Sequence, residues 1–298
     1  MRVLITGSAG FVGRHMAIAL LSHGPDVICI DLTAGVDCRA WFEANPSRRF
    51  DLVIHCAAVV GGRKTIDGEP LRLMAEDLSI DAALFRWALQ ARPGRIVYFS
   101  SSAAYPVKIQ QRYTPWIKGW RLHEWDIGRG SDVTLEPDQT YGWVKLTGER
   151  MAAEANAAGI KTHVFRPFSG YGTDQALDYP FPSFIRRAAQ RQAPFDVWGP
   201  GDSARDWIHI DDIVGAVQAA IDNDVLGPVN LCTGRAVTFD QLATMCMDTA
   251  GYTAPIRHID DAPRGVHWRV GDPTRMHEFY RPRITLEEGI ARALEVAA

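Results

Sequence analysis

Residues 3–13 read VLITGSAGFVG, and this stretch decides the fold of the N-terminal half. The run VLI is short and wholly apolar, as expected of a strand buried on both faces of a parallel sheet. Three glycines follow, and apolar residues at helical spacing begin directly after them. In this context Gly7 permits a tight turn, Gly10 lets the backbone approach a pyrophosphate, and Gly13 packs helix on strand. The stretch predicts a dinucleotide-binding unit, although a glycine-rich loop without a ligand has the same composition.

A second apolar run, at residues 27–30, ends at Asp31. A carboxylate in this position can accept hydrogen bonds from the adenosine ribose and repels a 2′-phosphate, which favours NAD over NADP. The absence of Lys or Arg before Arg39 supports the same choice. The next apolar run comes soon afterwards, at residues 51–55, so any further strand must fit within residues 32–36.

Strand patterns alternate with helical patterns in the middle of the chain. Strands are predicted at residues 51–55, 95–99 and 162–167, and helices at residues 74–91 and 140–158. Alternation of this kind is typical of an α/β fold with a doubly wound parallel sheet.

Small or polar residues come directly after two of these strands. Ala57 and Ala58 come after the strand that ends at His55, and three serines, at positions 100 to 102, come after the next strand. Doubly wound sheets bind ligands at the carboxyl ends of their strands. We therefore expect a serine hydroxyl to share a hydrogen bond with a substrate oxygen, although three serines also suit a merely polar strand end.

Tyr141 and Lys145 open the helix predicted at residues 140–158, which Gly159 ends. Residues four apart share one face of a helix, so the phenol and the ammonium point the same way. A free tyrosine is a poor base at neutral pH because its pKa is about 10, but a fixed positive charge nearby favours the phenolate. The pair predicts a base for a sugar hydroxyl; taken alone, the same spacing also occurs in amphipathic surface pairs.

Three helix starts are predicted in the C-terminal third. Asp211 can cap the helix that comes after it. Thr238 with Gln241, and Thr285 with Glu288, have the spacing of capping boxes. The chain has no internal repeat or low-complexity linker, so we expect one compact unit.

Composition narrows the class of protein. The 298 residues are 47% hydrophobic and 22% charged, which is typical of a globular protein, and a net charge of −3 argues against nucleic acid as a partner. No apolar run approaches the ~20 residues of a membrane span. The five cysteines are odd in number and lack Cys-x-x-Cys spacing, and the nine histidines are scattered. We expect a cytoplasmic enzyme with no metal site and no membrane partner.

The motifs occur in an order that resembles one family. They are the glycine loop, Asp31, the small residues after His55, the three serines, Tyr141 with Lys145, Arg166-Pro167, and RDWIHIDD at residues 205–212. Together they resemble the extended short-chain dehydrogenase/reductases, specifically the nucleotide-sugar epimerase/dehydratase group, from Met1 to about Ala293. The resemblance implies NAD as cofactor and a nucleotide sugar as substrate.

The resemblance also implies roles for single residues. Tyr141 is the catalytic base, and Lys145 tunes it and binds the nicotinamide ribose. Ser101 is the catalytic hydroxyl, since the family's Ser or Thr lies four residues before a tyrosine, here Tyr105; counting from Phe99 favours Ser102 instead. Cofactor contacts are implied at Gly7, Gly10, Phe11, Val12, Gly13, Asp31, Ala57, Ala58, Ser100, Tyr141, Lys145 and Pro167. Substrate contacts are implied at Ser102, Ser169, Arg205 and Arg269, with the two guanidinium groups on the diphosphate; a structural salt bridge is the alternative for each arginine.

Departures from the family pattern narrow the chemistry. Members that eliminate water carry an Asp-Glu pair directly after the catalytic Thr, and UDP-glucuronate decarboxylases place a Glu there, where this chain has Ser102 and Ala103. The epimerase-reductases that make GDP-fucose use a Cys in this loop and a later His, where this chain has Ala103 and DYP at residues 178–180. Among the family's reactions, these departures leave NAD-dependent 4-epimerisation of a UDP-type sugar as the expected one. In that hypothesis Tyr141 takes the 4-hydroxyl proton while hydride passes to NAD, the 4-keto sugar rotates, and hydride returns to the other face.

Two other functions compete with this hypothesis. One is an NAD(P)-dependent nucleotide-sugar dehydratase or 4-keto-sugar reductase, and the other is a non-catalytic dinucleotide-binding protein. The expected domains are a dinucleotide-binding Rossmann domain at residues 1–169 and 205–232, and a substrate-binding lobe at residues 170–204 and 233–298. The apolar faces of the helices at residues 74–91 and 140–158 predict a homodimer contact, although a buried intramolecular face gives the same pattern.

Overall fold

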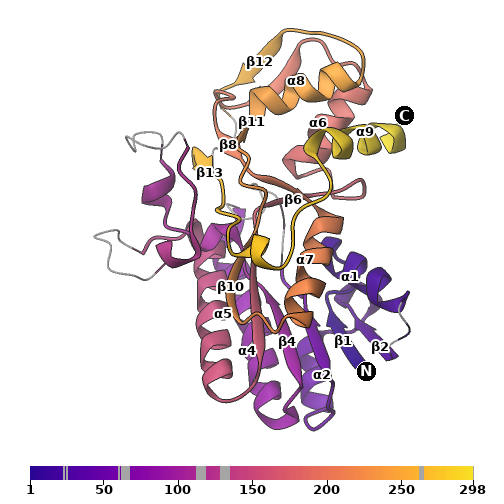
Figure 1. The fold of residues 1–298 in the computed structure, drawn as a ribbon, viewed down its shortest axis with the longest axis vertical. Helices are drawn as coiled ribbons and strands as arrows, with labels where there is room; N and C mark the ends of the chain where they lie inside the picture. Colours follow the sequence, from indigo (N-terminus) through magenta and orange to yellow (C-terminus); the bar gives the residue numbers. More distant parts are fainter. Residues whose placement is uncertain are drawn as a thin grey trace.

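The computed structural model describes residues 1–22, 24, 26–59, 61, 68–111, 119–127, 135–261 and 265–297. A parallel sheet with helices on both faces forms one part, and a smaller lobe lies over the carboxyl ends of the strands (Figure 1). The strands of the sheet are β1 (Arg2–Thr6), β2 (Asp26–Ile30), β3 (Leu52–His55), β4 (Arg95–Phe99), β5 (Thr162–Pro167) and β10 (Gly227–Leu231).

The sheet has the strand order β10-β5-β4-β3-β1-β2, and all of its pairings are parallel. Next to the edge strand β2, Leu4 of β1 pairs with Ile28 of β2 on one side and with Val53 of β3 on the other. Strands of this kind are apolar on both faces because helices cover both faces. The predicted doubly wound α/β fold is confirmed.

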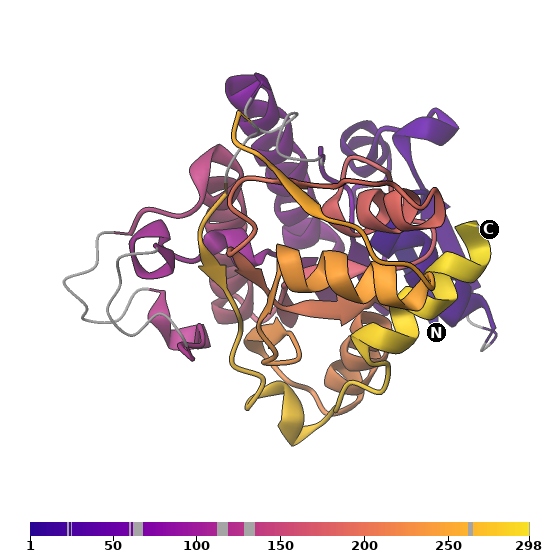
Figure 2. The ribbon, with the colours of Figure 1, turned by 90° about the horizontal axis from the view of Figure 1, so that it is seen from above.

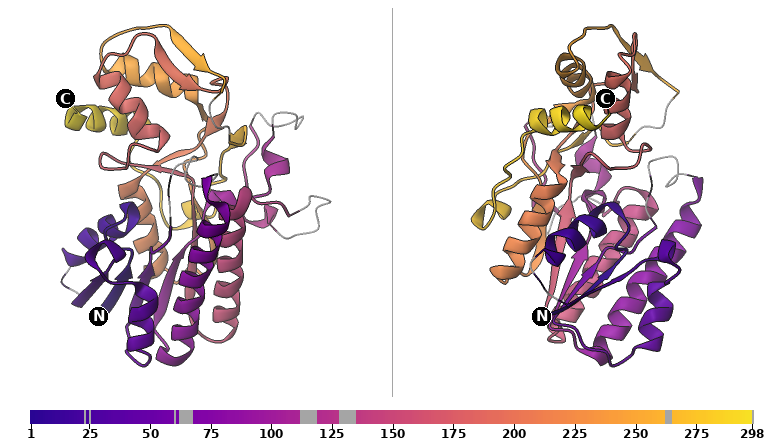
Figure 3. Two further views of the ribbon diagram at one scale, coloured as in Figure 1. Left: turned by 180° about the vertical axis from the view of Figure 1, so that it is seen from behind. Right: turned by 90° about the vertical axis from the view of Figure 1, so that its right-hand side faces the viewer.

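Two groups of helices enclose the sheet (Figure 3). One face is covered by α1 (Phe11–Leu21) and α7 (Ile210–Asp222), which pack side chains such as Met16 and Val217 on Ile5. The other face is covered by α2 (Cys38–Ala44), α4 (Pro70–Ala91) and α5 (Gln139–Ala157), with Leu84 and Ala152 packed on Leu4. Each face therefore has its own apolar core.

The smaller lobe has a third core. Its helices α6 (Pro180–Ala189), α8 (Phe239–Thr249) and α9 (Leu286–Ala297) pack against one another over the sheet (Figure 2). Phe184, Phe195 and Ile290 are buried among them. The other strands form small sheets of their own: β6 (Ser169–Tyr171) with β9 (Trp207–His209), β7 (Phe195–Trp198) with β12 (Ile256–Ile259), and β8 (Ala204–Arg205) between β11 (Val237–Thr238) and β13 (Trp268–Arg269). The predicted boundaries between the two domains stay a prediction.

Two local expectations are corrected by the structure. Residues 32–36 hold no strand, because the Asp31 carboxylate accepts from the backbone of Thr33 and caps a 3-10 helix, η1 (Leu32–Ala34). The prediction that Asp211 caps α7 is wrong. The helix begins at Ile210, so Asp211 lies in its first turn, and the N-cap is His209, whose Nδ1 accepts from the amide of Asp211 at 3.2 Å.

Other local predictions are confirmed. Thr238 and Gln241 form a reciprocal capping box at the start of α8. Thr285 and Glu288 exchange the equivalent hydrogen bonds at the start of α9. Gly159 has a φ of +79°, as expected directly after α5. Among the described residues, no helix is both long and apolar enough to cross a membrane.

Candidate active site

The loop after β1 brings backbone amides to the carboxyl edge of the sheet. Gly7 has a φ of +65°, and a Cβ there would lie 2.5 Å from the backbone nitrogen of Ala57. A Cβ on Gly13 would lie 2.1 Å from the carbonyl oxygen of Gly7. Gly10 is the N-cap of α1, whose first turn has no side-chain cap among the described residues. Uncapped amides at the positive end of a helix suit an anion, so the loop fits the pyrophosphate of a dinucleotide.

Asp31 lies beside this loop at the end of β2. Its Oδ2 accepts from the amide of Ala9 at 2.9 Å, and its Oδ1 accepts from the amide and hydroxyl of Thr33. Burial alone would raise the pKa of Asp31, but the hydrogen bonds from Thr33 and Ala9 outweigh it and lower the pKa. An ionised carboxylate therefore stands where the adenosine ribose is expected.

The remaining residues predicted to contact the cofactor lie at the same edge. Phe11 and Val12 form the first turn of α1, and Pro167 ends β5. Ala57 and Ala58 come after β3 and are half-buried. Strands β1, β3 and β5 thus bring these residues to one side of the sheet, as expected of parallel strands.

The three serines after β4 have different environments. Ser100 is buried and donates to the carboxylate of Glu149 in α5. Ser101 is half-buried and caps the 3-10 helix η2 (Ser102–Ala104), its Oγ accepting from the amide of Ala103 at 3.1 Å. Ser102 is buried within η2. Of the three hydroxyls, that of Ser101 is the most accessible to a substrate.

Tyr141 and Lys145 lie on one face of α5, as predicted. The Lys145 ammonium is 5.7 Å from the centroid of the Tyr141 ring and 5.5 Å from that of Tyr98. Lys145 is buried, whereas Tyr141 is half-buried. Burial alone would lower the pKa of Lys145, but negative charge on Tyr141, Asp81 and Asp77 outweighs it and raises the pKa. The lysine therefore stays charged beside the phenol.

Close backbone packing brings the serines to the tyrosine. The amide of Asp138, the N-cap of α5, donates to the carbonyl of Ala103 at 2.8 Å. A Cβ on Gly142 would lie 2.4 Å from the same oxygen. The glycine next to Tyr141 thus lets the start of α5 rest on η2, which joins the two predicted catalytic segments.

A buried ion pair lies behind the serines. Arg166 of β5 donates to both carboxylate oxygens of Glu149, at 2.7 and 2.6 Å, and to the hydroxyl of Tyr105 at 3.0 Å. Tyr105 in turn donates to Asn230 of β10 at 2.6 Å. This hydrogen-bond network links β5, α5 and β10, and Ser100 joins it by donating to Glu149. Arg166 appeared in the sequence only as part of a motif, and its partner Glu149 was not predicted.

The two predicted diphosphate ligands lie on neighbouring strands. Arg205 of β8 and Arg269 of β13 are register partners. Arg269 donates to Gln110 Oε1 at 2.7 Å and forms an ion pair with Asp138 at 2.9 Å, both side chains being nearly buried. The guanidinium of Arg205 lies 5.3 Å from the ring centroid of Phe239. Arg269 therefore contacts the start of α5, a link that the sequence did not indicate.

Ser169 and Tyr179 bring the smaller lobe to the same region. Ser169 begins β6, directly after β5, and its amide donates to the carbonyl of Asp206 at 2.9 Å. Tyr179 is the N-cap of α6. Burial raises the pKa of Tyr179, and the negative charges of Tyr141 and Asp178 add to the effect. Tyr179 thus lies close enough to Tyr141 for the two groups to interact electrostatically.

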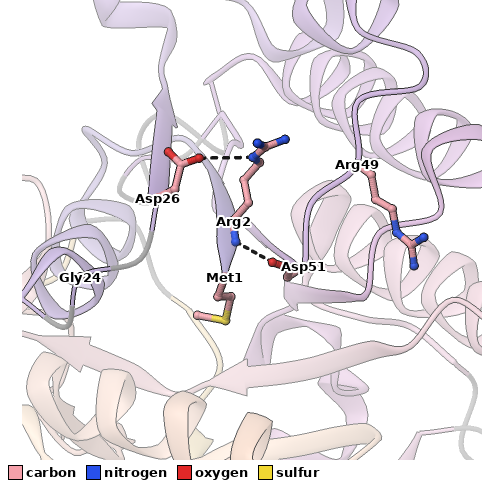
Figure 4. Close-up of a pocket in the computed structure, with 6 residues that line it drawn as sticks. All are labelled: Met1, Arg2, Gly24, Asp26, Arg49 and Asp51. Atoms are coloured by element: carbon pink, nitrogen blue, oxygen red, sulfur yellow. Dashed lines mark hydrogen bonds and ion pairs between the residues drawn. The ribbon is translucent and has the colours of Figure 1, made fainter.

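The opposite edge of the sheet also has a pocket, shown in Figure 4, with a volume of about 570 Å³. Arg2 lies in it between Asp26, which its side chain contacts at 3.3 Å, and Asp51, which its amide contacts at 2.6 Å. This pocket is at the amino ends of β1 and β2. Ligands of doubly wound sheets bind at the other edge, so the candidate site is the one built around Tyr141.

Asp77 of α4 leads to a prediction for the pH dependence of stability. Burial raises the pKa of this carboxyl from its usual 3.8 to about 6. Because the native state holds the proton more tightly than the unfolded chain, the stability this proton contributes is fully present below about pH 4 and is lost as pH rises through about 6. Asp77→Asn has no such proton. It is expected to gain roughly 2–3 kcal/mol of stability relative to the wild type between about pH 4 and pH 7.

Urea denaturation of both proteins at the two pH values measures this gain. Glu76→Gln is the matched control, since Glu76 is the preceding residue, is 41% exposed and pairs with Arg39. A difference in unfolding free energy between Asp77→Asn and the wild type that is the same at both pH values would contradict the prediction.

Comparison with known sequences identifies the family. The model of the NAD-dependent epimerase/dehydratase family matches residues 3–232. UDP-glucuronic acid decarboxylase 1 of Arabidopsis thaliana is 25% identical over 324 residues, covering 98% of this chain and 68% of the relative. GDP-mannose 3,5-epimerase 1 of Oryza sativa subsp. indica is 27% identical over 312 residues, covering 97% and 80%.

Solved structures share the fold. A UDP-glucose 4-epimerase of Thermus thermophilus, in complex with NAD, has a TM-score of 0.83 at 22% identity, covering 100% of this chain and 99% of that one. A dTDP-glucose 4,6-dehydratase of Streptomyces venezuelae has a TM-score of 0.81 at 22% identity, covering 99% and 96%. These two proteins share one fold, although one is an epimerase and the other a dehydratase. With a family model matching most of its length, the chain belongs to the NAD-dependent epimerase/dehydratase family and is an enzyme with NAD as its cofactor.

Proposed function

We propose that this enzyme is a nucleotide-sugar epimerase that inverts the 4-position of a UDP-type sugar through a transient 4-keto intermediate. The observation that carries the proposal is the composition of η2, where Ser102 and Ala103 lie against the start of the catalytic helix. Neither has a carboxyl group to act as the general acid that loss of water requires. The family relationship and the fold shared with a UDP-glucose 4-epimerase support the proposal.

Tyr141 is the base in this proposal. Its phenolate takes the proton of the sugar 4-hydroxyl, and the Lys145 ammonium on the same helix face favours the phenolate form. The oxygen of Ser101 accepts from the amide of Ala103, so its hydroxyl hydrogen can donate to the sugar oxygen. Tyr141 returns the proton when the 4-hydroxyl is restored on the other face. The phenol therefore acts as both acceptor and donor in one turnover.

The chain's own residues fit the cofactor. The uncapped N-terminus of α1 would hold the pyrophosphate, Asp31 the adenosine ribose, and Lys145 the nicotinamide ribose. When bound, NAD supplies reversible hydride transfer at carbon 4 of the sugar. Arg205 and Arg269 would hold the substrate diphosphate, with Asp138 keeping Arg269 in position. A sugar tethered only through its diphosphate can rotate between the two half-reactions.

One observation favours the alternative of a dehydratase or a 4-keto-sugar reductase. Tyr179 of the smaller lobe interacts electrostatically with Tyr141, and burial raises the pKa of Tyr179, so its phenol is a proton donor. A second proton donor at the site would serve a reaction in which a proton is delivered to a carbon or to a leaving hydroxyl. The alternative therefore depends on Tyr179, whereas epimerisation does not.

The homodimer and the cytoplasmic location stay predictions. Exposed apolar side chains on the two helices named for the dimer support the first: Leu71 and Leu89 of α4 are 79% and 56% exposed, and Trp143 of α5 is 43% exposed. A second copy covering α4 and α5 would bury them.

A panel of UDP-, GDP-, CDP- and dTDP-sugars tests the function. The purified protein is incubated with each sugar without added cofactor, and products are separated by chromatography with mass detection. A product of unchanged mass and shifted retention is expected for a UDP-sugar. Loss of water, or consumption of NADH on a 4-keto sugar, would overturn the epimerase proposal in favour of the alternative. Binding without turnover of any sugar would favour the non-catalytic dinucleotide-binding protein.

A further inference from the structure

Lys145 is buried beside Tyr141 on the same face of α5. Its ammonium lies between two phenol rings, that of Tyr141 and that of Tyr98 in the central strand β4. A buried ammonium loses several kcal/mol of hydration unless charges or dipoles replace the water. Here the side chains beyond Tyr98, which include a carboxylate, supply such charges and dipoles.

Tyr98 leads to a carboxylate. Its hydroxyl donates to Asp81 Oδ2 at 2.6 Å, from β4 across to α4. Asp81 Oδ1 lies 3.4 Å from His55 Nε2, an ion-pair contact longer than a good hydrogen bond. The other ring nitrogen of His55 lies 2.8 Å from the hydroxyl of Thr6. The four side chains are buried, so this row from β4, α4, β3 and β1 has a fixed geometry.

A second carboxylate lies one helical turn earlier. Asp77 Oδ1 accepts from the amide of Val59, and Asp77 Oδ2 is buried with no hydrogen-bond partner among the described residues. Two buried acids four residues apart on an otherwise apolar helix face destabilise a fold unless they face positive charge. The charge of Lys145 lowers the pKa of both carboxyl groups, and both carboxylates raise the pKa of Lys145.

The packing of α5 makes room for the row. A Cβ on Gly148 would lie 1.8 Å from the Tyr98 hydroxyl and 2.9 Å from Asp81 Oδ2. Any larger residue at this position would displace the tyrosine. The glycine thus lets the phenol of Tyr98 pass between α4 and α5 and reach Asp81.

Several titratable groups lie near Lys145. Besides Asp77 and Asp81 of α4, they are Tyr141 and Glu149 of α5, His55 and Cys56 at the end of β3, and Tyr98 of β4. Burial alone would raise the pKa of Asp81, but contact with His55 and the charge of Lys145 outweigh it and lower the pKa. Burial raises the pKa of Cys56 to about 12 and that of Tyr98 well above its usual value. Of the nearby carboxylates, Glu149 is paired with Arg166, whereas Asp81 and Asp77 act on Lys145 and raise its pKa.

We propose that Asp81 and Asp77 are counter-charges of Lys145 that set the pH at which Tyr141 ionises, and that Tyr98 and His55 hold Asp81 in place. Lys145 alone favours the phenolate, and the two carboxylates behind it oppose that effect. This inference rests on the proposed function, in which Tyr141 must both accept and return a proton. A phenol that ionises near the working pH can do both, whereas a permanently ionised one is too weak a base to take up the proton that it must later return. Asp81 and Asp77 are positioning and tuning residues, not groups that touch the substrate.

A titration of Tyr141 without substrate tests the proposal. The near-ultraviolet phenolate absorbance of the NAD-loaded protein is recorded against pH, and the same titration of its Tyr141→Phe partner is subtracted. With Asp81→Asn, which keeps the side-chain shape and an acceptor for Tyr98, the midpoint is expected to fall by about one pH unit. Asp77→Asn is expected to move it in the same direction by less. Glu76→Gln, which removes a carboxylate from the surface of the same helix, is expected to leave it unchanged.

The pH profile of kcat/KM is the second measurement. Both limbs should move to lower pH in Asp81→Asn, because the phenolate becomes easier to form and the Lys145 ammonium easier to lose. If Asp81→Asn does not fold, Asp77→Asn carries the test. Midpoints that stay with the wild type in the folded variants would overturn the proposal and leave the carboxylates a purely structural role. Since the titration needs no turnover, a shifted midpoint in a protein that epimerises no sugar would overturn the proposed function alone.

Discussion

Tyr141→Phe is expected to lower kcat by about 100- to 10,000-fold while leaving the fold intact. The substitution removes the proton-accepting oxygen and keeps the ring against which the Lys145 ammonium lies. General acid–base catalysis contributes a factor of this size when it acts in the rate-limiting step. Product formation is measured on the nucleotide sugar identified in the panel, and thermal unfolding followed by circular dichroism reports on the fold.

Tyr252→Phe is the matched control. It removes a phenol hydroxyl from the smaller lobe, where Tyr252 donates to the carbonyl of Gln192 at 3.4 Å, far in sequence from the catalytic helix. The control is expected to keep the wild-type kcat. Wild-type turnover in Tyr141→Phe would show that another group takes the proton, and Tyr179 would then be the first candidate.

Glu149→Gln is expected to lower the free energy of unfolding by about 3–5 kcal/mol. Both oxygens of the Glu149 carboxylate accept from Arg166, and one also accepts from Ser100. The side chains of the ion pair are 8% and 2% exposed, so the substitution leaves a buried guanidinium without its counter-charge. Urea denaturation of the variant and the wild type measures the loss.

Glu154→Gln on the same helix separates this effect from a general effect of charge. Glu154 pairs with Arg150 at 2.6 Å, and the two side chains are 62% and 78% exposed. Exposed pairs of this kind contribute little, so the control is expected to lose less than about 0.5 kcal/mol. Equal losses in the two variants would contradict the prediction, because the buried Glu149–Arg166 pair would then contribute no more to stability than an exposed pair.

The two predictions test different links between structure and function. Tyr141 lies where the substrate is expected, and its loss should affect catalysis without affecting stability. Glu149 holds β5 and the catalytic helix together from behind, and its loss should affect stability first. The carboxylates near Lys145 should affect both catalysis and stability. Asp77 is expected to destabilise the protein above about pH 6 while it tunes the catalytic pair, a trade between stability and function seen at many active sites.

Local patterns were sufficient for the elements that carry the site. The glycine loop, the strand ending at Asp31 and the helix of Tyr141 were predicted because each depends on residues close together in the chain. The spacing of Tyr141 and Lys145 places both on one helix face whatever the helix packs against. For the same reason the capping boxes of α8 and α9 were predicted correctly. Errors at helix starts, as at Asp211, were limited to one turn.

Contacts between distant segments were not predictable from spacing. For Arg269 the sequence leaves a substrate contact and a structural salt bridge both open, and it does not indicate Asp138, 131 residues away at the start of α5, as the partner. Glu149 has no distinguishing pattern within its helix, and its role depends on the position of Arg166 in β5. The sequence did contain one indication of a buried charged contact: Asp77 and Asp81 lie four residues apart on the apolar face of α4, where a buried acid needs a partner.

Short-range backbone geometry and side-chain periodicity are encoded within a few residues, so local sequence was enough to specify the doubly wound sheet, the dinucleotide-binding loop and the Tyr141–Lys145 pair. The surroundings of that pair depend instead on how distant segments pack. The position of Asp81 beneath Lys145 depends on how closely α4 and α5 approach, and Gly148 sets that approach by leaving space for Tyr98. A charge acts on every group within a few ångströms regardless of its place in the chain, so the electrostatics of the site follow from packing rather than from any motif.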